Sequence, residues 1–228
     1  MTPIYTVVIE GNIGSGKTTL VRKLQHSVPE FTVFPEPVEK WQNVVQDGQT
    51  VNLLKQFYED PATFAVPFQK EILRTYDLLH KQQVATPFKV MERCIHSSEI
   101  FQEVLLADQI LTQEQFHDLH QHKQALCAYD PMSLHPNPFS PDLIIYLRTD
   151  PQTCLTRVRE RMRSEEGGVT LDYLNKLHFT HDLYTSRAPT PVCKINGGLS
   201  PSEVYRSVVT TIFTSYCTDR LAKYLHAH

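Results

Sequence analysis

The 228-residue sequence predicts an α/β fold in which a five-stranded parallel sheet carries helices on both faces. Short apolar runs rich in Val and Ile recur along the chain without strict polar–apolar alternation, as strands buried on both faces do. Segments of helical periodicity lie between these runs. Regular alternation of strands and helices is typical of a parallel sheet covered on both sides.

Each predicted strand is a run of four to seven residues, a common strand length. The first begins shortly after the N-terminal methionine and leads directly into a glycine-rich loop. The fourth is the longest of the five. In chain order, the predicted strands are 5–10, 31–34, 88–92, 142–148 and 191–195.

The intervening segments show the helical period and several helix-start signals. Asp150 is a good N-cap and Pro151 suits the first helical position. Ser200 and Glu203 have the spacing of a capping box. In the second helical segment, large apolar side chains recur every four residues and so share one face. The predicted helices are 17–26, 64–79, 100–127, 150–163 and a last one that begins near Ser200.

The composition restricts the function classes. A net charge of -3 argues against a nucleic-acid partner held by bulk positive charge. The five cysteines are widely spaced and odd in number, so we expect reduced thiols and no zinc site. No apolar run reaches the roughly 18 residues that a membrane span needs. We therefore expect a single domain over 1–228, soluble and cytoplasmic, with neither nucleic acid nor membrane as a partner.

The segment after the first strand matches the phosphate-loop pattern G-x-x-x-x-G-K-[ST] in full, and a helix follows it as the pattern requires. Backbone N–H groups and the helix N-terminus attract phosphate there. Lys17 can reach the β- and γ-phosphates, and the Thr18 hydroxyl can bind Mg²⁺. The predicted ATP-binding residues of the loop are Gly11, Asn12, Ile13, Gly14, Ser15, Gly16, Lys17, Thr18 and Thr19.

The second strand ends at Glu36, which lies between Pro35 and Pro37. Ligands of parallel α/β sheets bind beyond the carboxyl ends of the strands. Phosphoryl transfer to an alcohol needs a carboxylate that accepts or aligns the hydroxyl, and two prolines fix the backbone around it. The third strand delivers Glu92 and Arg93 to the same edge. We interpret Glu36 as catalytic; the alternative is a carboxylate that merely ends a strand in solvent.

Arginines at alternate positions follow the fourth strand, from Arg157 to Arg163. Arg157 and Arg161 fall on one stripe of the predicted helix. A solvated basic face is the ordinary interpretation of such a pattern. Because guanidinium groups neutralise phosphoryl charge, we favour an arginine-rich lid at about 157–168 that closes over a triphosphate.

Together these motifs resemble the deoxyribonucleoside kinase family, which includes deoxycytidine, deoxyguanosine and mitochondrial thymidine kinases. The resemblance runs from about residue 5 to about residue 187 and implies a P-loop kinase fold. The short chain resembles a viral thymidine kinase that acts inside a host cell. The matching stretches, in the family's order, are GNIGSGKTT, EPVEKW, PFQ, MER, DLIIYLRT and RSEE followed by LDYLNKLHFTH.

The resemblance implies a role for each matching residue. ATP and Mg²⁺ are the implied cofactors, a small deoxynucleoside is the substrate, and a homodimer through 100–127 is the implied assembly. Glu36 is the base at the 5′-hydroxyl with Arg93 beside it, and Lys17 completes the catalytic set. The implied metal residues are Thr18 and Glu92; the lid residues are Arg157, Arg161 and Arg163; the substrate residues are Trp41, Tyr58, Gln69 and Glu166.

The sequence departs from the family around the base. After Arg93 it has Cys94 where the family has serine. The stacking aromatic is either Phe101, or absent with Gln102 in its position. Tyr76 and Ser98 replace the arginine and aspartate of the deoxycytidine and deoxyguanosine kinases. We therefore expect thymidine as the first substrate with deoxycytidine also accepted.

Three other functions remain open at this point. A thymidylate-type kinase would phosphorylate a nucleoside monophosphate instead. A GTPase-like switch protein should carry an N-K-x-D guanine motif, but the one Asn-Lys pair, at Asn175, continues as Leu177-His178. The third alternative is an inactive family member that serves as a scaffold. The altered segment at Cys94 motivates it.

Overall fold

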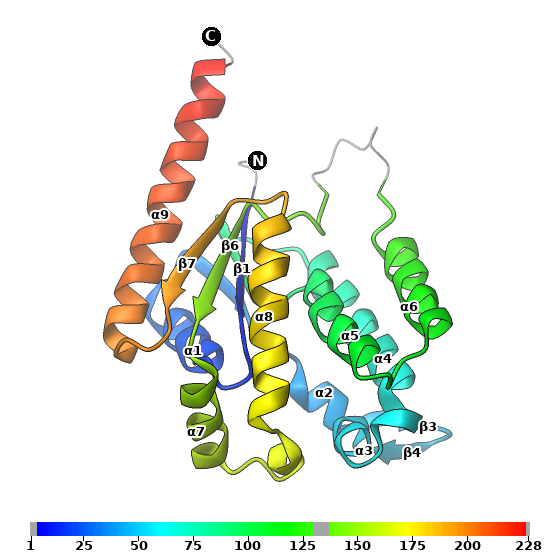
Figure 1. Cartoon of the computed structure of the whole chain (residues 1–228). Helices are drawn as coiled ribbons and strands as arrows, with labels where there is room; N and C mark the ends of the chain where they lie inside the picture. Colours follow the sequence, from blue (N-terminus) through cyan, green and yellow to red (C-terminus); the bar gives the residue numbers. More distant parts are fainter. Residues whose placement is uncertain (1–3, 130–136, 227–228) are drawn as a thin grey trace.

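The computed structural model describes residues 4–129 and 137–226, and within them it confirms the predicted α/β fold. Five parallel strands form one sheet in the order β2-β5-β1-β6-β7 (Figure 1). All five predicted strands are present, within a residue of their expected ends. Their bounds are β1 Tyr5–Gly11, β2 Phe31–Phe34, β5 Phe88–Glu92, β6 Leu143–Arg148 and β7 Val192–Asn196.

Helices pack against both faces of the sheet, as predicted. One face is covered by α1 and α9, whose apolar side chains join the largest core cluster. The other face carries the helices from α3 to α6 and also α8 (Figure 1). The helical bounds are α1 Lys17–Ser27, α2 Val38–Gln42, α3 Leu53–Glu59, α4 Pro61–Lys81, η1 Ile95–Ser97, α5 Ser98–Ala107, α6 Gln113–Leu126, α7 Pro151–Arg161, η2 Ser164–Gly168, α8 Leu171–Arg187 and α9 Pro201–His226.

A short antiparallel hairpin, β3 Val44–Gln46 with β4 Gln49–Val51, was not predicted. Its turn residues Asp47 and Gly48 both have positive φ angles, 49° and 78°. This is the pattern of a two-residue hairpin turn, for which Asp-Gly is a favoured sequence. The Asp-Gly pair was therefore a usable signal, but three-residue strands fall below the length that periodicity detects.

The sheet register brings the predicted site residues to one edge. Ile9 lies beside Glu92 in the β1–β5 pair, and Gly11 lies beside Leu147 in the β1–β6 pair. Parallel strands end on the same side, so the segments after β1, β2, β5 and β6 meet there. This edge faces α7 and the start of α8 at the bottom of Figure 1.

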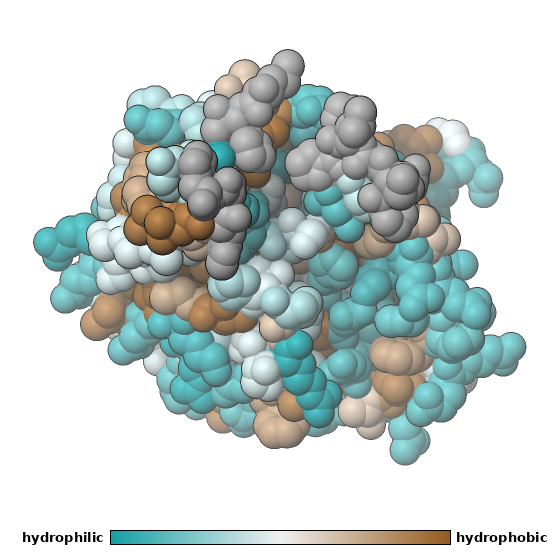
Figure 2. All heavy atoms as spheres, turned by 90° about the horizontal axis from the view of Figure 1, so that it is seen from above, coloured by the Kyte–Doolittle hydropathy of each residue, from teal (hydrophilic) through white to brown (hydrophobic). Residues whose placement is uncertain are grey.

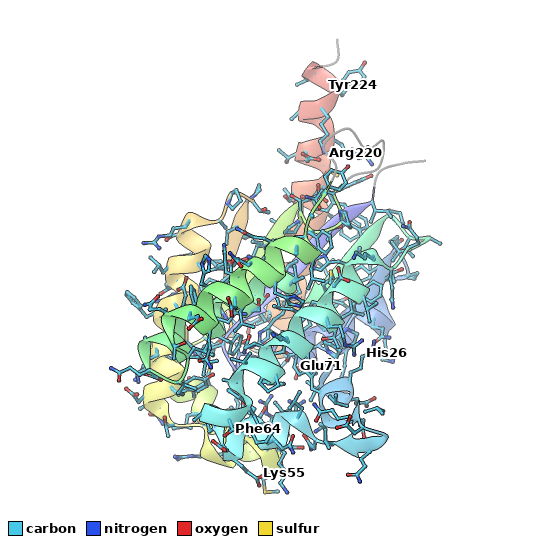
Figure 3. All side chains as sticks on the ribbon, turned by 90° about the vertical axis from the view of Figure 1, so that its right-hand side faces the viewer. His26, Lys55, Phe64, Glu71, Arg220 and Tyr224 are labelled. Carbon is cyan, nitrogen blue, oxygen red and sulfur yellow. The ribbon has the colours of Figure 1, made fainter. Side chains whose placement is uncertain are left out.

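The opposite end of the molecule carries both termini, and α9 extends past the sheet (Figure 1). Viewed onto that end, polar and apolar residues are interspersed over the visible surface (Figure 2). Arg220 and Tyr224 lie on the extending part of α9, far from Lys55 and Phe64 on α3 and α4 (Figure 3). None of the described helices combines the length and apolarity that a membrane crossing requires. The five cysteines form no disulfide.

Candidate active site

A cavity of about 270 Å³ lies at the carboxyl edge of the sheet. Its phosphate-loop end is formed by residues 13–19. Its apolar end consists of Trp41, Leu54, Phe57, Phe68 and Ile72, which belong to one buried cluster of α2, α3 and α4. Every predicted site residue except Gly11 and Asn12 lines this cavity.

The phosphate loop folds as its glycines require. Gly14 has φ 76°, and a Cβ there would lie 2.5 Å from the Cys154 carbonyl oxygen, so a side chain is excluded. The Asn12 amide donates to the Leu174 carbonyl oxygen at 2.8 Å and ties the loop to α8. Gly11 and Asn12 thus support the loop from behind, while the next seven residues face the cavity.

Lys17 is the first residue of α1, and its ammonium group points back into the phosphate loop. It donates to the Gly11 and Asn12 carbonyl oxygens at 2.9 and 2.8 Å. Burial and then the nearby Arg93 charge lower the pKa of Lys17, against the opposing effect of Glu36 and Glu92, and the net result is a pKa of about 8. The side chain is therefore charged at neutral pH and held at the phosphate-loop end.

Glu36 points into the cavity and forms an ion pair with Arg93. Its backbone N–H also donates to the Glu92 carboxylate at 3.3 Å. Burial acts to raise the pKa of Glu36, but the Arg93 and Lys17 charges outweigh burial and hold this pKa below its ordinary value. The carboxylate is ionised at neutral pH and 16% exposed, so it is fixed in place but accessible.

Arg93 has an unusual backbone conformation for a residue with a long side chain. Its φ is 59°, in the left-handed region, which costs about 1–3 kcal/mol. This turn after β5 brings the guanidinium back over the sheet edge, where it contacts Glu36 and donates to the Gly11 carbonyl oxygen at 3.2 Å. The same guanidinium lies 4.8 Å from the centre of the Phe101 ring. Strain that persists at such a position indicates a functional constraint.

Thr18 and Glu92 fit the metal site predicted for them. The Thr18 hydroxyl donates to the Glu92 carboxylate at 2.7 Å, and both side chains line the cavity beside Lys17. No cluster of three or more His, Cys, Asp or Glu side chains suited to a metal occurs among residues 4–129 and 137–226. One carboxylate with one hydroxyl suits Mg²⁺, which binds few protein groups and completes its shell with phosphate and water.

The predicted lid arginines have protein partners in this structure. Arg161 and Arg163 both form ion pairs with Glu166 of η2. Arg157 donates to the Ser15 and Gly197 carbonyl oxygens, joining the phosphate loop to the segment after β7. All three arginines line the cavity, so they lie where a triphosphate would bring negative charge.

The residues predicted to bind the nucleoside lie around the apolar end. The Trp41 indole donates to the Thr75 hydroxyl at 2.9 Å and packs edge-on against Phe68. Tyr58 lines the cavity, and its pKa is raised chiefly by burial and then by Tyr173 and Glu166. Gln69 is 1% exposed and presents its amide from α4.

The sequence left open whether an aromatic side chain, Phe101, is available to stack on the base. In the structure Phe101 lines the cavity wall, whereas Gln102 is buried against Gln69. The two residues that replace the arginine–aspartate pair are both committed elsewhere. The Tyr76 hydroxyl donates to the Glu92 carbonyl oxygen at 3.2 Å, and the Ser98 hydroxyl donates to the Ile95 carbonyl oxygen at 2.7 Å. The apolar end therefore has no charged group comparable to that pair among the described lining residues.

Sequence reasoning assigned no role to two carboxylates, Glu10 and Glu165, although Glu165 was expected near this edge of the sheet. Glu10 is fully buried beneath the site, accepts from the Ser97 hydroxyl, and has its pKa raised by burial despite the Arg93 charge. The sequence did carry a signal for Glu10, because an ionisable residue inside an apolar strand is unusual. Glu165 of η2 accepts from Gln42 at 2.8 Å and from Asn52 at 3.2 Å, so it links the lid to α2 and to the start of α3. Nothing in the sequence indicates those partners.

A strand, a phosphate loop and a helix, with a fixed carboxylate after β2 of the same sheet, define a P-loop phosphotransferase. The family model for deoxynucleoside kinases matches residues 7–218, and the chain belongs to this family. It is a nucleoside kinase. The match also argues against the switch-protein alternative, since the family is one of kinases.

Several kinases are similar to this chain. Chicken deoxycytidine kinase 2 is 32% identical over 199 residues, which covers 78% of this chain and 72% of that protein. Human mitochondrial thymidine kinase 2 is 32% identical over 177 residues, 77% of this chain and 62% of that protein. The thymidine kinase of Ictalurid herpesvirus 1 is 31% identical over 204 residues, 88% of this chain and 82% of that protein.

Proposed function

We propose that this nucleoside kinase transfers the γ-phosphate of ATP to the 5′-hydroxyl of a deoxynucleoside, with thymidine preferred and deoxycytidine accepted. The observation that carries the proposal is the Glu36–Arg93 ion pair, which lies in a cavity shared by a phosphate loop and an apolar cluster. A nucleoside that places its base in the apolar end would bring its 5′-hydroxyl towards Glu36.

Glu36 accepts the hydroxyl proton or aligns the oxygen for in-line attack. Its lowered pKa keeps it ionised, and Arg93 holds it in one orientation. Lys17 exchanges its contacts with the loop carbonyl oxygens for contacts with the transferring phosphate. The lid arginines Arg161 and Arg163 share their charge between Glu166 and the triphosphate.

Thr18 and Glu92 would hold Mg²⁺, which would supply charge neutralisation at the phosphates. Glu166 and Tyr58 bind the sugar 3′-hydroxyl. Both line the cavity, and the neighbouring charge of Glu166 contributes to the raised pKa of Tyr58. The phenol therefore stays protonated and acts as a hydrogen-bond donor.

The base preference rests on the apolar end. An amide such as that of Gln69 can pair with the edge of either pyrimidine, because it has a donor and an acceptor in one plane. The replacement of the arginine–aspartate pair by Tyr76 and Ser98 leaves a slot that accepts the thymine methyl group. A methyl group is discriminated by only about 1–3 kcal/mol, so deoxycytidine is also accepted.

The test is a substrate panel of thymidine, deoxycytidine, deoxyadenosine, deoxyguanosine and thymidine monophosphate, each with ATP and Mg²⁺. We expect the highest kcat/KM for thymidine, measurable turnover of deoxycytidine, and none of the monophosphate. Transfer to the monophosphate alone would establish the thymidylate-type alternative. Turnover of none of the five would support the inactive scaffold.

We further propose that 1–228 acts as one kinase domain in the cytoplasm and as a homodimer that pairs through 100–127, the segment of α5 and α6. Light scattering at micromolar concentration tests the assembly, and a monomeric mass would overturn it.

A further inference from the structure

Two glutamine side chains form a buried pair next to the apolar end of the cavity. The Gln102 amide nitrogen donates to the Gln69 amide oxygen at 3.2 Å. Each residue is 1% exposed. Gln69 comes from the middle of α4 and lines the cavity, whereas Gln102 comes from the second turn of α5 and does not line it. Gln102 is thus placed to act on the cavity through Gln69.

Three other residues of the cavity wall separate the roles further. Phe101, the neighbour of Gln102 in sequence, faces the cavity and packs on the Arg93 guanidinium. Tyr76 and Ser98 donate their hydroxyl protons to carbonyl oxygens. Gln69 is therefore the amide side chain that lines this wall of the cavity. Within the described part of the chain, its side-chain hydrogen bond is the one that it accepts from Gln102.

A glutamine amide can face a pyrimidine in two orientations. Thymine offers a donor at N3 and an acceptor at position 4, while cytosine offers an acceptor at N3 and a donor at position 4. The Gln69 amide must turn over to match one base after the other. A buried partner that could only donate or only accept would leave one orientation with an unpaired polar atom, which is costly.

Gln102 can satisfy both orientations, because its own amide also carries a donor and an acceptor and can turn over with that of Gln69. We propose that Gln102 is a positioning residue for base recognition, which holds the Gln69 amide against the base and supports both of its orientations. It thereby allows one cavity to accept both thymidine and deoxycytidine. This inference rests on the proposed function.

The test compares three variants with the wild type. Gln102→Met keeps the volume but removes the hydrogen bond. Gln102→Glu keeps the shape and an acceptor but loses the NH₂ donor. Gln56→Met makes the same change at a half-buried glutamine of α3 that does not line the cavity, and serves as the matched control. Steady-state kinetics with thymidine and deoxycytidine are measured for all of them, and thermal melting confirms folding.

We expect Gln102→Met to raise KM for both nucleosides by about 10-fold, the typical effect of a lost buried hydrogen bond, with kcat and the KM for ATP within about threefold. Gln102→Glu should favour one amide orientation and change the thymidine-to-deoxycytidine ratio of kcat/KM by about fivefold or more. A purely structural role would lower the melting temperature and leave that ratio unchanged.

The inference is overturned if a folded Gln102 variant keeps both KM values and the ratio within twofold of wild type, as Gln56→Met should. If Gln102→Met does not fold, the thymidine-to-deoxycytidine ratio of kcat/KM measured for Gln102→Glu decides the test. Wild-type protein that phosphorylates neither nucleoside overturns the proposed function and this inference together. Wild-type turnover with unchanged variants overturns the inference only.

Discussion

The phosphate-loop end of the cavity is formed by consecutive residues, 13–19, whereas the apolar end is assembled from side chains of separate helices. The first depends on backbone geometry at Gly14 and on charges that follow directly on strand ends. The second depends on how α2, α3, α4 and α5 pack together. A phosphate is common to all nucleotide donors and can be bound by a local motif. A base differs from one substrate to another and is bound by tertiary structure.

The comparison makes a kinetic prediction. Changes at the charged residues around the phosphate loop should lower kcat or kcat/KM for ATP. Changes that affect the apolar end should raise the KM for the nucleoside with little effect on ATP. Four substitutions or conditions test this division, from the largest expected effect to the smallest.

Arg93→Lys should lower kcat by about 100-fold, because an ammonium cannot bridge Glu36 and the Gly11 carbonyl oxygen as the guanidinium does. Steady-state kinetics with saturating thymidine and ATP measure the effect. Arg159→Lys, at an exposed position of α7, is the control and should be unchanged. Equal kcat for both variants would remove Arg93 from the positioning of Glu36.

Gln69→Met should raise the KM for thymidine by about 10- to 50-fold, since the base loses its hydrogen-bonding partner at similar side-chain volume. The KM for ATP should stay within twofold, because Gln69 lies outside the phosphate-loop end. A comparable rise in both KM values would contradict the separation of the two ends.

Rising pH should weaken the phosphate-loop end. The pKa of Lys17 is lowered to about 8, so its charge is present below pH 8 and is lost above it. We expect kcat/KM for ATP to fall towards tenfold per pH unit above about pH 8. Lys17→Arg keeps its charge at all accessible pH values and should flatten this limb. Protonation of Glu36 should not affect the profile at neutral pH, because its pKa lies below the ordinary value.

Glu165→Ala should have the smallest effect, a rise of about three- to fivefold in KM for thymidine. It removes the acceptor shared by Gln42 and Asn52 and so loosens the contact between the lid and α2. Glu160→Ala, an exposed residue of α7, is the matched control. No difference between these two variants would show that the contact does not hold the cavity wall.

The phosphate-loop end and the apolar end also differ in how much of each the sequence could predict. The five strands, the phosphate loop and the positions of Glu36 and Arg93 follow from periodicity and from motifs that are contiguous in the chain. The Glu36–Arg93 ion pair was predictable as proximity, because both residues follow strands that end at one edge. The left-handed turn at Arg93 was not, since no neighbouring glycine or asparagine marks it.

At the apolar end, spacing alone left Phe101 and Gln102 as alternatives, and only packing resolved them. One helical residue of difference rotates a side chain by about 100°, enough to exchange a cavity-facing position for a buried one. The contact between Gln69 and Gln102 spans 33 positions and joins two helices, so no local pattern records it. The partners of Glu165 were not predicted for the same reason, because they lie more than 100 positions away.

The most direct test of the account is Glu36→Gln, studied by turnover and by calorimetric binding of thymidine. The substitution keeps the shape of the side chain but removes its charge and its ability to take a proton. We predict that kcat falls by about 10²- to 10⁴-fold while the Kd for thymidine stays within threefold. A variant with wild-type kcat, or one that no longer binds thymidine, would contradict the placement of the chemistry at Glu36 and of base binding at the apolar end.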